Sequence, residues 1–396
     1  MPEFAGAGFE LSEQHTALRE TVADFAHERV APVIGEYYAA GKFPYSLVAE
    51  AAELGLFGLP FPEVYGGMGG DGLALCLAIE ELARVDSSLA VTLQAAVGLG
   101  AMPIYRFGTE AQKTEWLPRL CSGHMLGAFG LTEPGGGTDA SSTRTRAELR
   151  GNADSGEWVI NGTKAFITNA GTDITGLITV TAVTSERTDT ASEISAIIVP
   201  AGTPGLQVGP PYSKVGWCCS DTREVSLTDV HVPAANLLGE QGAGYRQFLQ
   251  ILDSGRIAIA ALATGLAQGC LDESLRYTKQ REAFGHAIAQ YQAISFTLAD
   301  MATRVHTARL AYYDAAMRRD MGHDVRQRAA MAKLHAADVA VRNARDATQL
   351  HGGYGFMNET PVARMWRDAK ILEIGEGTNE VQRMVIAHEL GLGRES

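Results

Sequence analysis

Short β-branched segments interrupt an otherwise helical pattern between about residues 126 and 235, and this interruption limits the folds open to the chain. The segments are Glu157–Ile160, Leu177–Val183, Ile194–Val199 and Glu224–Thr228, and Gly, Pro, Asn and Asp residues separate them. This is the pattern of a β-domain. No helix of a dozen residues alternates with these strands, which disfavours a parallel βαβ sheet.

Helical patterns flank this β segment on both sides. Before it, Ser12 can cap a helix whose apolar residues recur through Val30, before Pro32. After it, apolar residues recur at alternating steps of four and three, as on a bundle helix: Ile294, Leu298, Met301, Val305, Ala308, Tyr312 and Ala315. We therefore expect an α+β chain with an N-terminal helical domain (1–125), a middle β-domain (126–235) and a C-terminal helical bundle (236–396).

Charge and composition narrow the class of protein. The formal net charge of −13 argues against nucleic acid or an anionic membrane as a general partner. No apolar run approaches the roughly 20 residues of a membrane span, and the N-terminus lacks the basic and apolar regions of a signal peptide. The five cysteines are odd in number and the ten histidines lack metal-site spacing. We expect a cytoplasmic protein with reduced thiols and no metal.

Two glycine-rich segments could carry chemistry. Glu376 lies between Gly375 and Gly377, where the backbone is open to a flat ligand, and Thr378 or Asn379 can cap the helix that follows. The second segment reads Phe129-Gly-Leu-Thr-Glu-Pro-Gly-Gly-Gly-Thr-Asp139. Taken alone, a solvated carboxylate and a flexible turn are the commoner meanings of these patterns.

Taken together, the two segments resemble the signature regions of the acyl-CoA dehydrogenases, flavoenzymes that desaturate acyl-CoA thioesters. The resemblance runs from about residue 11 to 391 and includes the loop Tyr65–Gly70 and the segment Arg281–Gly285. It implies a middle domain of the β-barrel kind and a C-terminal four-helix bundle. It also implies FAD as cofactor and a homotetramer built as a dimer of dimers.

The resemblance makes Glu376 the catalytic base that removes the proton from the α carbon of the thioester. Such a base needs a pKa raised toward neutrality, which enclosure beside an apolar acyl chain provides. The family's other base position corresponds to Gly255, which has no side chain. The product is then a trans-2-enoyl-CoA, and the electrons pass to an electron-transfer flavoprotein.

The same resemblance assigns the binding residues. The expected FAD contacts are Phe129, Leu131, Thr132, Gly137, Thr138, Phe166, Ile167, Thr168, Arg281, Phe284, Gln292, Gln349, Leu350, His351, Gly352, Gly353, Thr378, Asn379 and Glu380. Those from Arg281 through Gly353 are expected to reach FAD in a neighbouring subunit. The expected substrate contacts are Thr138, Asp253, Ser254, Gly255, Arg256 and Gly377.

Three alternatives share this fold. An acyl-CoA oxidase would use O₂ directly, but such chains usually carry an extra C-terminal helical domain. A non-enzymatic or nucleic-acid-associated flavin-binding homologue would show a basic patch or an extra domain and need not keep Glu376. A nitroalkane oxidase would prefer Asp at that position. Gly375 stands where many straight-chain members have Tyr, so the acyl group is left open.

Overall fold

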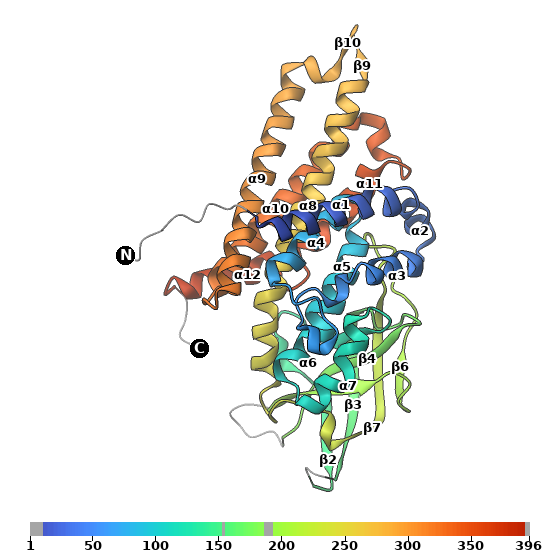
Figure 1. Cartoon of the computed structure of the whole chain (residues 1–396), viewed down its shortest axis with the longest axis vertical. Helices are drawn as coiled ribbons and strands as arrows, with labels where there is room; N and C mark the ends of the chain where they lie inside the picture. The colour runs from blue at the N-terminus through green and yellow to red at the C-terminus, as the bar shows by residue number, and fades with distance from the viewer. Residues whose placement is uncertain (1–10, 153–154, 186–192, 393–396) are drawn as a thin grey trace. The chain divides into compact units, whose positions relative to one another are not determined.

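The computed structural model describes residues 11–152, 155–185 and 193–392 (Figure 1). The first ten residues, where no signal peptide is expected, lie outside this range. The chain divides into two compact units. The β unit comprises Ala40–Gly70 and Val91–Gly255, and the helical unit comprises Met1–Ala39, Asp71–Ala90 and Arg256–Ser396.

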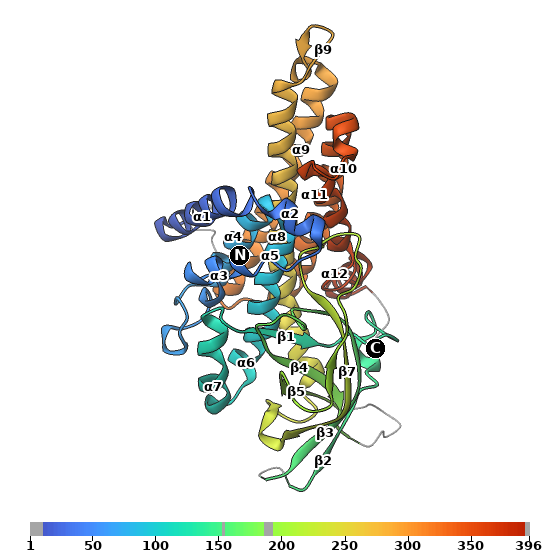
Figure 2. The same ribbon diagram turned by 90° about the vertical axis from the view of Figure 1, so that its right-hand side faces the viewer.

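One eight-stranded sheet dominates the β unit (Figure 2). Its strands are β1 (Leu126–Gly130), β2 (Arg146–Arg150), β3 (Glu157–Thr168), β4 (Thr175–Val183), β5 (Ile194–Pro200), β6 (Leu206–Val208), β7 (Thr222–Pro233) and β8 (Leu237–Leu238). The pairing order is β6-β7-β3-β2-β4-β5-β8, with β1 beside β4. Pairing is antiparallel except that β1 and β2 each run parallel to β4. The predicted middle β-domain is confirmed.

The β-branched and aromatic residues of the strands fill the core of the sheet. Trp158, Ile160, Val180, Ile197 and Val225 are buried in one apolar cluster. Burial of these side chains is the main favourable term for the sheet. Short helices complete the β unit: α3 (Tyr45–Glu53), α6 (Met102–Phe107) and α7 (Glu110–Cys121), with the 3₁₀ turns Leu56–Gly58 and Glu63–Tyr65 and the π-helical turn Ala95–Ala101.

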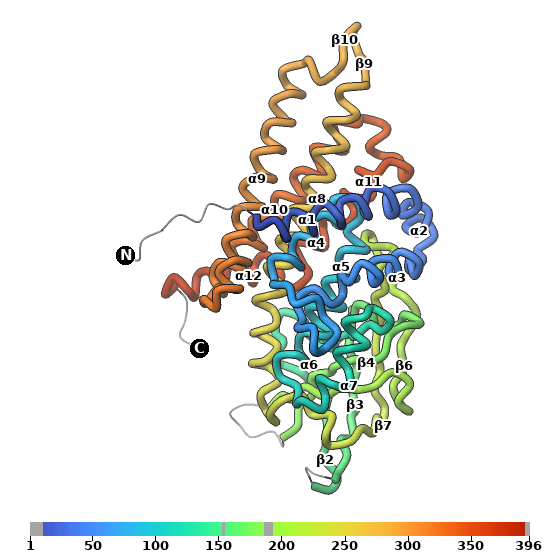
Figure 3. The backbone as a smooth tube through the Cα atoms, viewed as in Figure 1, coloured from blue at the N-terminus to red at the C-terminus, as the bar shows by residue number. Residues whose placement is uncertain are grey.

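The helical unit is built mainly from helices, of which α9 and α10 are long (Figure 3). The helices are α1 (Glu13–Phe25, continued by a π-helical turn to Val30), α2 (Ile34–Ala40), α4 (Gly72–Val85), α9 (Gln292–Asp320), α10 (Arg326–His351), α11 (Pro361–Ala369) and α12 (Asn379–Glu389). α10 packs against α9, α11 and α12. Two further helices, α5 (Ser87–Gln94) and α8 (Gly244–Gln280), belong partly to each unit, because the chain is divided after Ala90 and after Gly255.

Local signals in the sequence explain where these helices begin. The side chains of Ser12, Asp71 and Thr378 accept backbone hydrogen bonds at the starts of α1, α4 and α12. Such caps satisfy donors that the first helical turn leaves unpaired. Of the predicted stripe on α9, all residues but the half-buried Ile294 are buried. The N-terminal and C-terminal helical domains are confirmed.

Within the residues that the structure describes, two helical stretches reach the length and hydropathy of a membrane span, Ser87–Phe107 and Gly244–Gln280. In their most apolar windows 83% and 72% of the residues are buried inside the protein. Core helices have this property, so these stretches are accounted for by packing. All five cysteines are free, four of them buried.

Candidate active site

Glu376 lies on a sharp turn between a 3₁₀ segment (Lys370–Glu373) and α12. Its φ is 56° and that of Gly377 is 88°, so two successive residues are left-handed. Glycine adopts this conformation freely, whereas a glutamate pays roughly 1 kcal/mol. A strained, half-buried carboxylate is therefore presented from a fixed backbone.

Neighbouring side chains hold this turn in place. The carbonyl oxygen of Gly377 accepts hydrogen bonds from the side-chain nitrogens of Gln382 and Lys333, each at 2.8 Å. A Cβ atom at Gly377 would lie 2.9 Å from the Gln382 amide nitrogen, so only glycine fits without a shift. Thr378 caps α12, Asn379 is buried beneath it, and Glu380 is exposed on its first turn.

The predicted substrate residues Asp253 to Arg256 form one turn of α8. Asp253 and Ser254 are half-buried, while Gly255 and Arg256 are buried. Arg256 is only 4% exposed, so its guanidinium is a charge held inside the protein. The turn thus combines a buried cation with a glycine at the family's second base position.

In the β unit, the glycine-rich loop after β1 is anchored by Glu133. The Glu133 carboxylate accepts hydrogen bonds from the backbone N–H groups of Arg144 (2.8 Å) and Thr145 (3.0 Å), from the Thr145 hydroxyl (2.7 Å) and from the Lys164 ammonium (2.7 Å). Lys164 also donates to the carbonyl of Leu131 at 3.3 Å. The start of the loop is therefore fixed from inside the sheet.

The charges of this anchor are set by burial and by each other. Burial lowers the pKa of Lys164 to about 8, although Glu133 opposes the change. Burial alone would raise the pKa of Glu133, but Lys164 and the Thr145 hydrogen bonds outweigh it and lower that pKa. Both groups are thus mainly charged at pH 7.

The rest of the loop is open. Gly137 and Thr138 are exposed, and Leu131 and Thr132 are half-buried. A Cβ added at any of Gly135, Gly136 or Gly137 would meet nothing closer than 3.4 Å. Packing within the chain does not require these glycines, which leaves room for an external ligand to approach the backbone.

Phe166 projects from an irregularity in the pairing of β3 with β7, between Lys164 and Ile167. Its φ is 61° and its side chain is 64% exposed, with its ring centroid 5.2 Å from that of Tyr212. Ile167 is buried and Thr168 is half-buried. Phe166 is therefore not a core residue of the sheet. An exposed aromatic ring at positive φ suits stacking on a flat ligand.

Phe129, also assigned to FAD, lies on β1 and is half-buried. Its ring stacks on that of Phe248, with centroids 5.4 Å apart.

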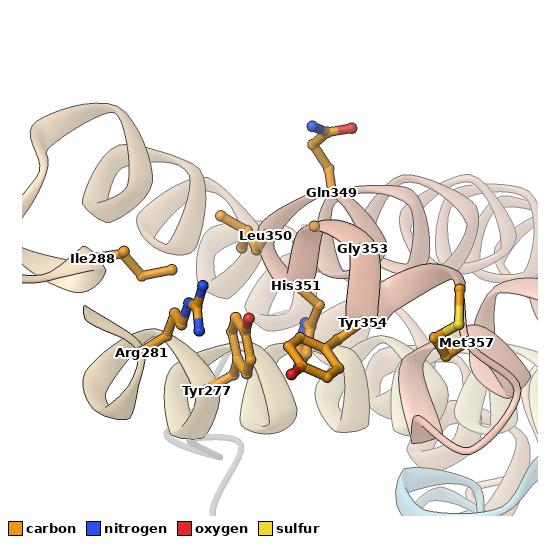
Figure 4. Close-up of a pocket in the computed structure, with 10 residues that line it drawn as sticks. Tyr277, Arg281, Ile288, Gln349, Leu350, His351, Gly353, Tyr354 and Met357 are labelled. Atoms are coloured by element: carbon orange, nitrogen blue, oxygen red, sulfur yellow. The ribbon is translucent and has the colours of Figure 1, made fainter. Parts of the chain in front are cut away.

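A pocket of about 500 Å³ lies in the helical unit (Figure 4). It brings together six predicted FAD residues: Arg281, Gln349, Leu350, His351, Gly352 and Gly353. Four further lining residues escaped sequence analysis: Tyr277, Ile288, Tyr354 and Met357. Tyr277 lies four residues, about one helical turn, before Arg281. This spacing places both side chains on one face of the helix and could have indicated that Tyr277 lines the same pocket.

The chemistry of this pocket suits an anionic ligand with flat rings. The His351 ring stacks on Tyr277 at a centroid distance of 4.3 Å, and Arg281 lies beside them (Figure 4). Burial lowers the pKa of His351, so the imidazole is neutral at pH 7. A Cβ added at Gly352 or Gly353 would meet nothing within 4 Å. A guanidinium beside open backbone is a suitable site for phosphate oxygens.

Of the residues expected to reach FAD in a neighbouring subunit, two do not line this pocket. Figure 1 labels the short hairpin of β9 (Glu282–Ala283) and β10 (His286–Ala287). Phe284 lies in the turn between these two strands and is 95% exposed. Gln292 is the exposed first residue of α9. Their positions leave both side chains available to another molecule.

Sequence analysis did not identify the residues that support these segments. Glu133 lies inside the glycine-rich segment Phe129–Asp139, and Lys164 lies on β3, where a lysine within a strand was the available signal. Lys333 had none, because it meets the Glu376 turn only through the folded chain. Gln382 lies only five residues after Gly377, but its residue type gave no sign of the contact.

Three family models together cover most of the chain. The N-terminal domain of acyl-CoA dehydrogenase matches residues 12–124, the middle domain matches residues 128–230 and the C-terminal domain matches residues 242–391.

Individual proteins agree. The probable acyl-CoA dehydrogenase YngJ of Bacillus subtilis is 50% identical over 96% of this chain and 99% of its own length. The solved butyryl-CoA dehydrogenase of Megasphaera elsdenii is 43% identical, with a TM-score of 0.93 over 97% of this chain and all of that one. A chain from a structure of the electron transferring flavoprotein of Acidaminococcus fermentans is 42% identical, with a TM-score of 0.92 over 97% and 99% of the two chains. The chain thus belongs to the acyl-CoA dehydrogenase family of FAD-dependent oxidoreductases.

Proposed function

We propose that the protein converts an acyl-CoA thioester to its trans-2-enoyl-CoA, with Glu376 as the catalytic base. The observation that carries this proposal is the Glu376 turn: a carboxylate on a left-handed turn, held by two hydrogen bonds to Gly377. A base whose backbone is fixed loses little freedom when it reaches its proton.

The open loops and the arginine-bearing pocket fit FAD. Phe129, Leu131, Thr132, Gly137, Thr138 and Phe166 to Thr168 would hold the ring system and the pyrophosphate from the β unit. Arg281 and Gln349 to Gly353 would hold FAD of a second copy, together with Phe284 and Gln292. Thr378, Asn379 and Glu380 would complete the site at the start of α12.

When bound, FAD accepts the hydride that leaves the β carbon of the substrate. Glu376 takes the proton from the α carbon, and the electron pair of that C–H bond forms the new double bond. The substrate thereby loses two electrons and two hydrogens in total. Asp253, Ser254, Gly255, Arg256, Thr138 and Gly377 would line the acyl-CoA site, where buried Arg256 offers a positive charge to the polar part of the thioester.

We further propose that electrons leave through an electron-transfer flavoprotein. The similarity to a chain from the structure of the A. fermentans electron transferring flavoprotein supports this acceptor. We propose that the protein is a homotetramer, a dimer of dimers, because the FAD sites would be shared between copies. We propose the cytoplasm as its location.

A panel of straight and branched acyl-CoAs, mixed anaerobically with the purified yellow protein, tests the reaction. We expect at least one thioester to bleach the flavin absorbance with formation of one equivalent of enoyl-CoA. Absence of bleaching by every acyl-CoA, with FAD bound, would refute the proposal. The panel includes branched thioesters because Gly375 leaves space beside the base, where an added Cβ would lie 3.5 Å from the nearest atom, the Ile371 carbonyl oxygen.

A further inference from the structure

A fully buried lysine reaches the Glu376 turn from α10. Lys333 is 0% exposed, and its ammonium donates to the carbonyl oxygen of Gly377 at 2.8 Å and to Oδ1 of Asn379 at 3.2 Å. An ammonium group without water around it is costly unless it is well coordinated. Lys333 carries this cost directly behind Gly377, the residue that follows Glu376.

The acceptors of Lys333 are themselves fixed. Asn379 is buried, and its amide nitrogen donates to Oδ1 of Asp338 on α10 at 2.9 Å. Its amide oxygen is thus turned toward Lys333. Gln382, also buried, shares the Gly377 carbonyl with Lys333. Side chains from both α10 and α12 therefore hydrogen-bond to the turn at Gly377.

The charges around Lys333 are mixed. Burial lowers its pKa to about 8, which leaves the side chain mainly protonated at pH 7. The carboxylate of Glu376 opposes this change most strongly, and Glu373 and Glu380 add to that opposition. The guanidinium of Arg256 acts in the same direction as burial. Lys333 and Glu376 thus interact electrostatically as well as through the backbone.

We propose that Lys333 is a positioning residue for the proton abstraction, clamping the Glu376–Gly377 turn and placing a positive charge behind the carboxylate. The inference rests on the proposed function, because it assigns Lys333 a role through Glu376. Lys333 acts through the turn and touches neither substrate nor cofactor in this account.

Two substitutions separate the clamp from the charge. Lys333→Met keeps a long, unbranched side chain but removes both the donor and the charge. Lys333→Gln keeps a side-chain N–H donor, one atom shorter than lysine, and removes the charge. Arg328→Met is the matched control, because it removes a surface cation on α10 whose partner is Asp314 at 3.2 Å.

The readouts are FAD content, the single-turnover rate of flavin reduction, its half-saturating acyl-CoA concentration and its pH profile. We expect Lys333→Met to keep FAD and half-saturation while the rate falls about tenfold or more, since misplacement of a base acts on the chemical step. The acidic limb of the profile should move to higher pH, because a cation that favours ionised Glu376 has gone. Lys333→Gln should recover part of the rate and keep the moved limb, and Arg328→Met should match wild type.

The proposal is overturned if Lys333→Met reduces flavin within twofold of wild type, or if the rate falls while the acidic limb stays in place. Should Lys333→Met not fold, an unmoved limb in Lys333→Gln overturns it equally. Glu376→Gln, measured in parallel, distinguishes a failure of the proposed catalytic base from a failure of the positioning role of Lys333. If that variant still reduces flavin, the proposed base is wrong; if it does not and the Lys333 variants behave as wild type, only the positioning role fails.

Discussion

The ammonium of Lys164 lies 2.7 Å from Oε1 of Glu133 inside the β unit, and this pair ties the glycine-rich loop to β3. Lys164 is fully buried, and the pair also binds Leu131, Thr145 and Thr181. The exposed part of this loop has few contacts of its own to hold it. The buried pair supplies them from beneath.

Lys164→Met should therefore destabilise the β unit and weaken FAD binding. The substitution leaves the Glu133 carboxylate buried without its cation, which costs about 3 kcal/mol in the free energy of unfolding at pH 7. Urea unfolding and the FAD content of the purified variant measure both effects. Glu133→Gln combined with Lys164→Met is the control, and it should recover part of the lost stability. A Lys164→Met protein that is as stable as wild type and retains its full FAD content would contradict the role of the buried pair in holding the loop.

Lys333 should make the free energy of unfolding increase with pH in the alkaline range. Its pKa of about 8 lies below the ordinary 10.5, so between these values the unfolded chain holds a proton that the folded chain has released. The folded state gains stability from this group as pH rises through that window, by up to roughly 3 kcal/mol. Unfolding of wild type and Lys333→Met at pH 7 and pH 10 isolates the effect. Wild type should gain relative to the variant, and an unchanged difference would contradict the expectation.

Arg281→Ala should lower the FAD content of the purified protein. The guanidinium stands in the 500 Å³ pocket beside open glycine backbone, where it is the expected partner of the pyrophosphate. Lys279→Ala, which removes an exposed cation two residues earlier, serves as the control and should retain FAD. Absorbance and size-exclusion chromatography give cofactor content and assembly. An Arg281→Ala protein with full FAD and unchanged assembly would show that the contact is misassigned.

The order of helical, β and helical segments could be predicted because apolar periodicity reports which faces are buried, as the α9 stripe shows. Caps at Ser12 and Thr378 could also be predicted, since a cap is a local contact. Phe166 was harder, because its exposure follows from a local break in the register of two strands distant in sequence. Lys333 could not be found at all: its partners lie more than 40 residues away, and a buried lysine looks like any other lysine in a helical pattern.

The electron acceptor separates a dehydrogenase from an oxidase of the same fold. Turnover should be fast with ferrocenium or an electron-transfer flavoprotein and slow with O₂. Measuring acyl-CoA consumption with each acceptor, alongside peroxide, gives the comparison. Stoichiometric peroxide at a rate comparable to that with ferrocenium would favour the oxidase.

The most direct test of the account is the single-turnover rate of flavin reduction by acyl-CoA in Glu376→Gln. Glutamine is nearly isosteric with glutamate, so the left-handed turn and its hydrogen bonds to Lys333 and Gln382 should survive. The variant should bind FAD and acyl-CoA but reduce flavin about 10²- to 10⁴-fold more slowly, because the proton acceptor has gone. A rate within a few-fold of wild type would place the base elsewhere and contradict the mechanism.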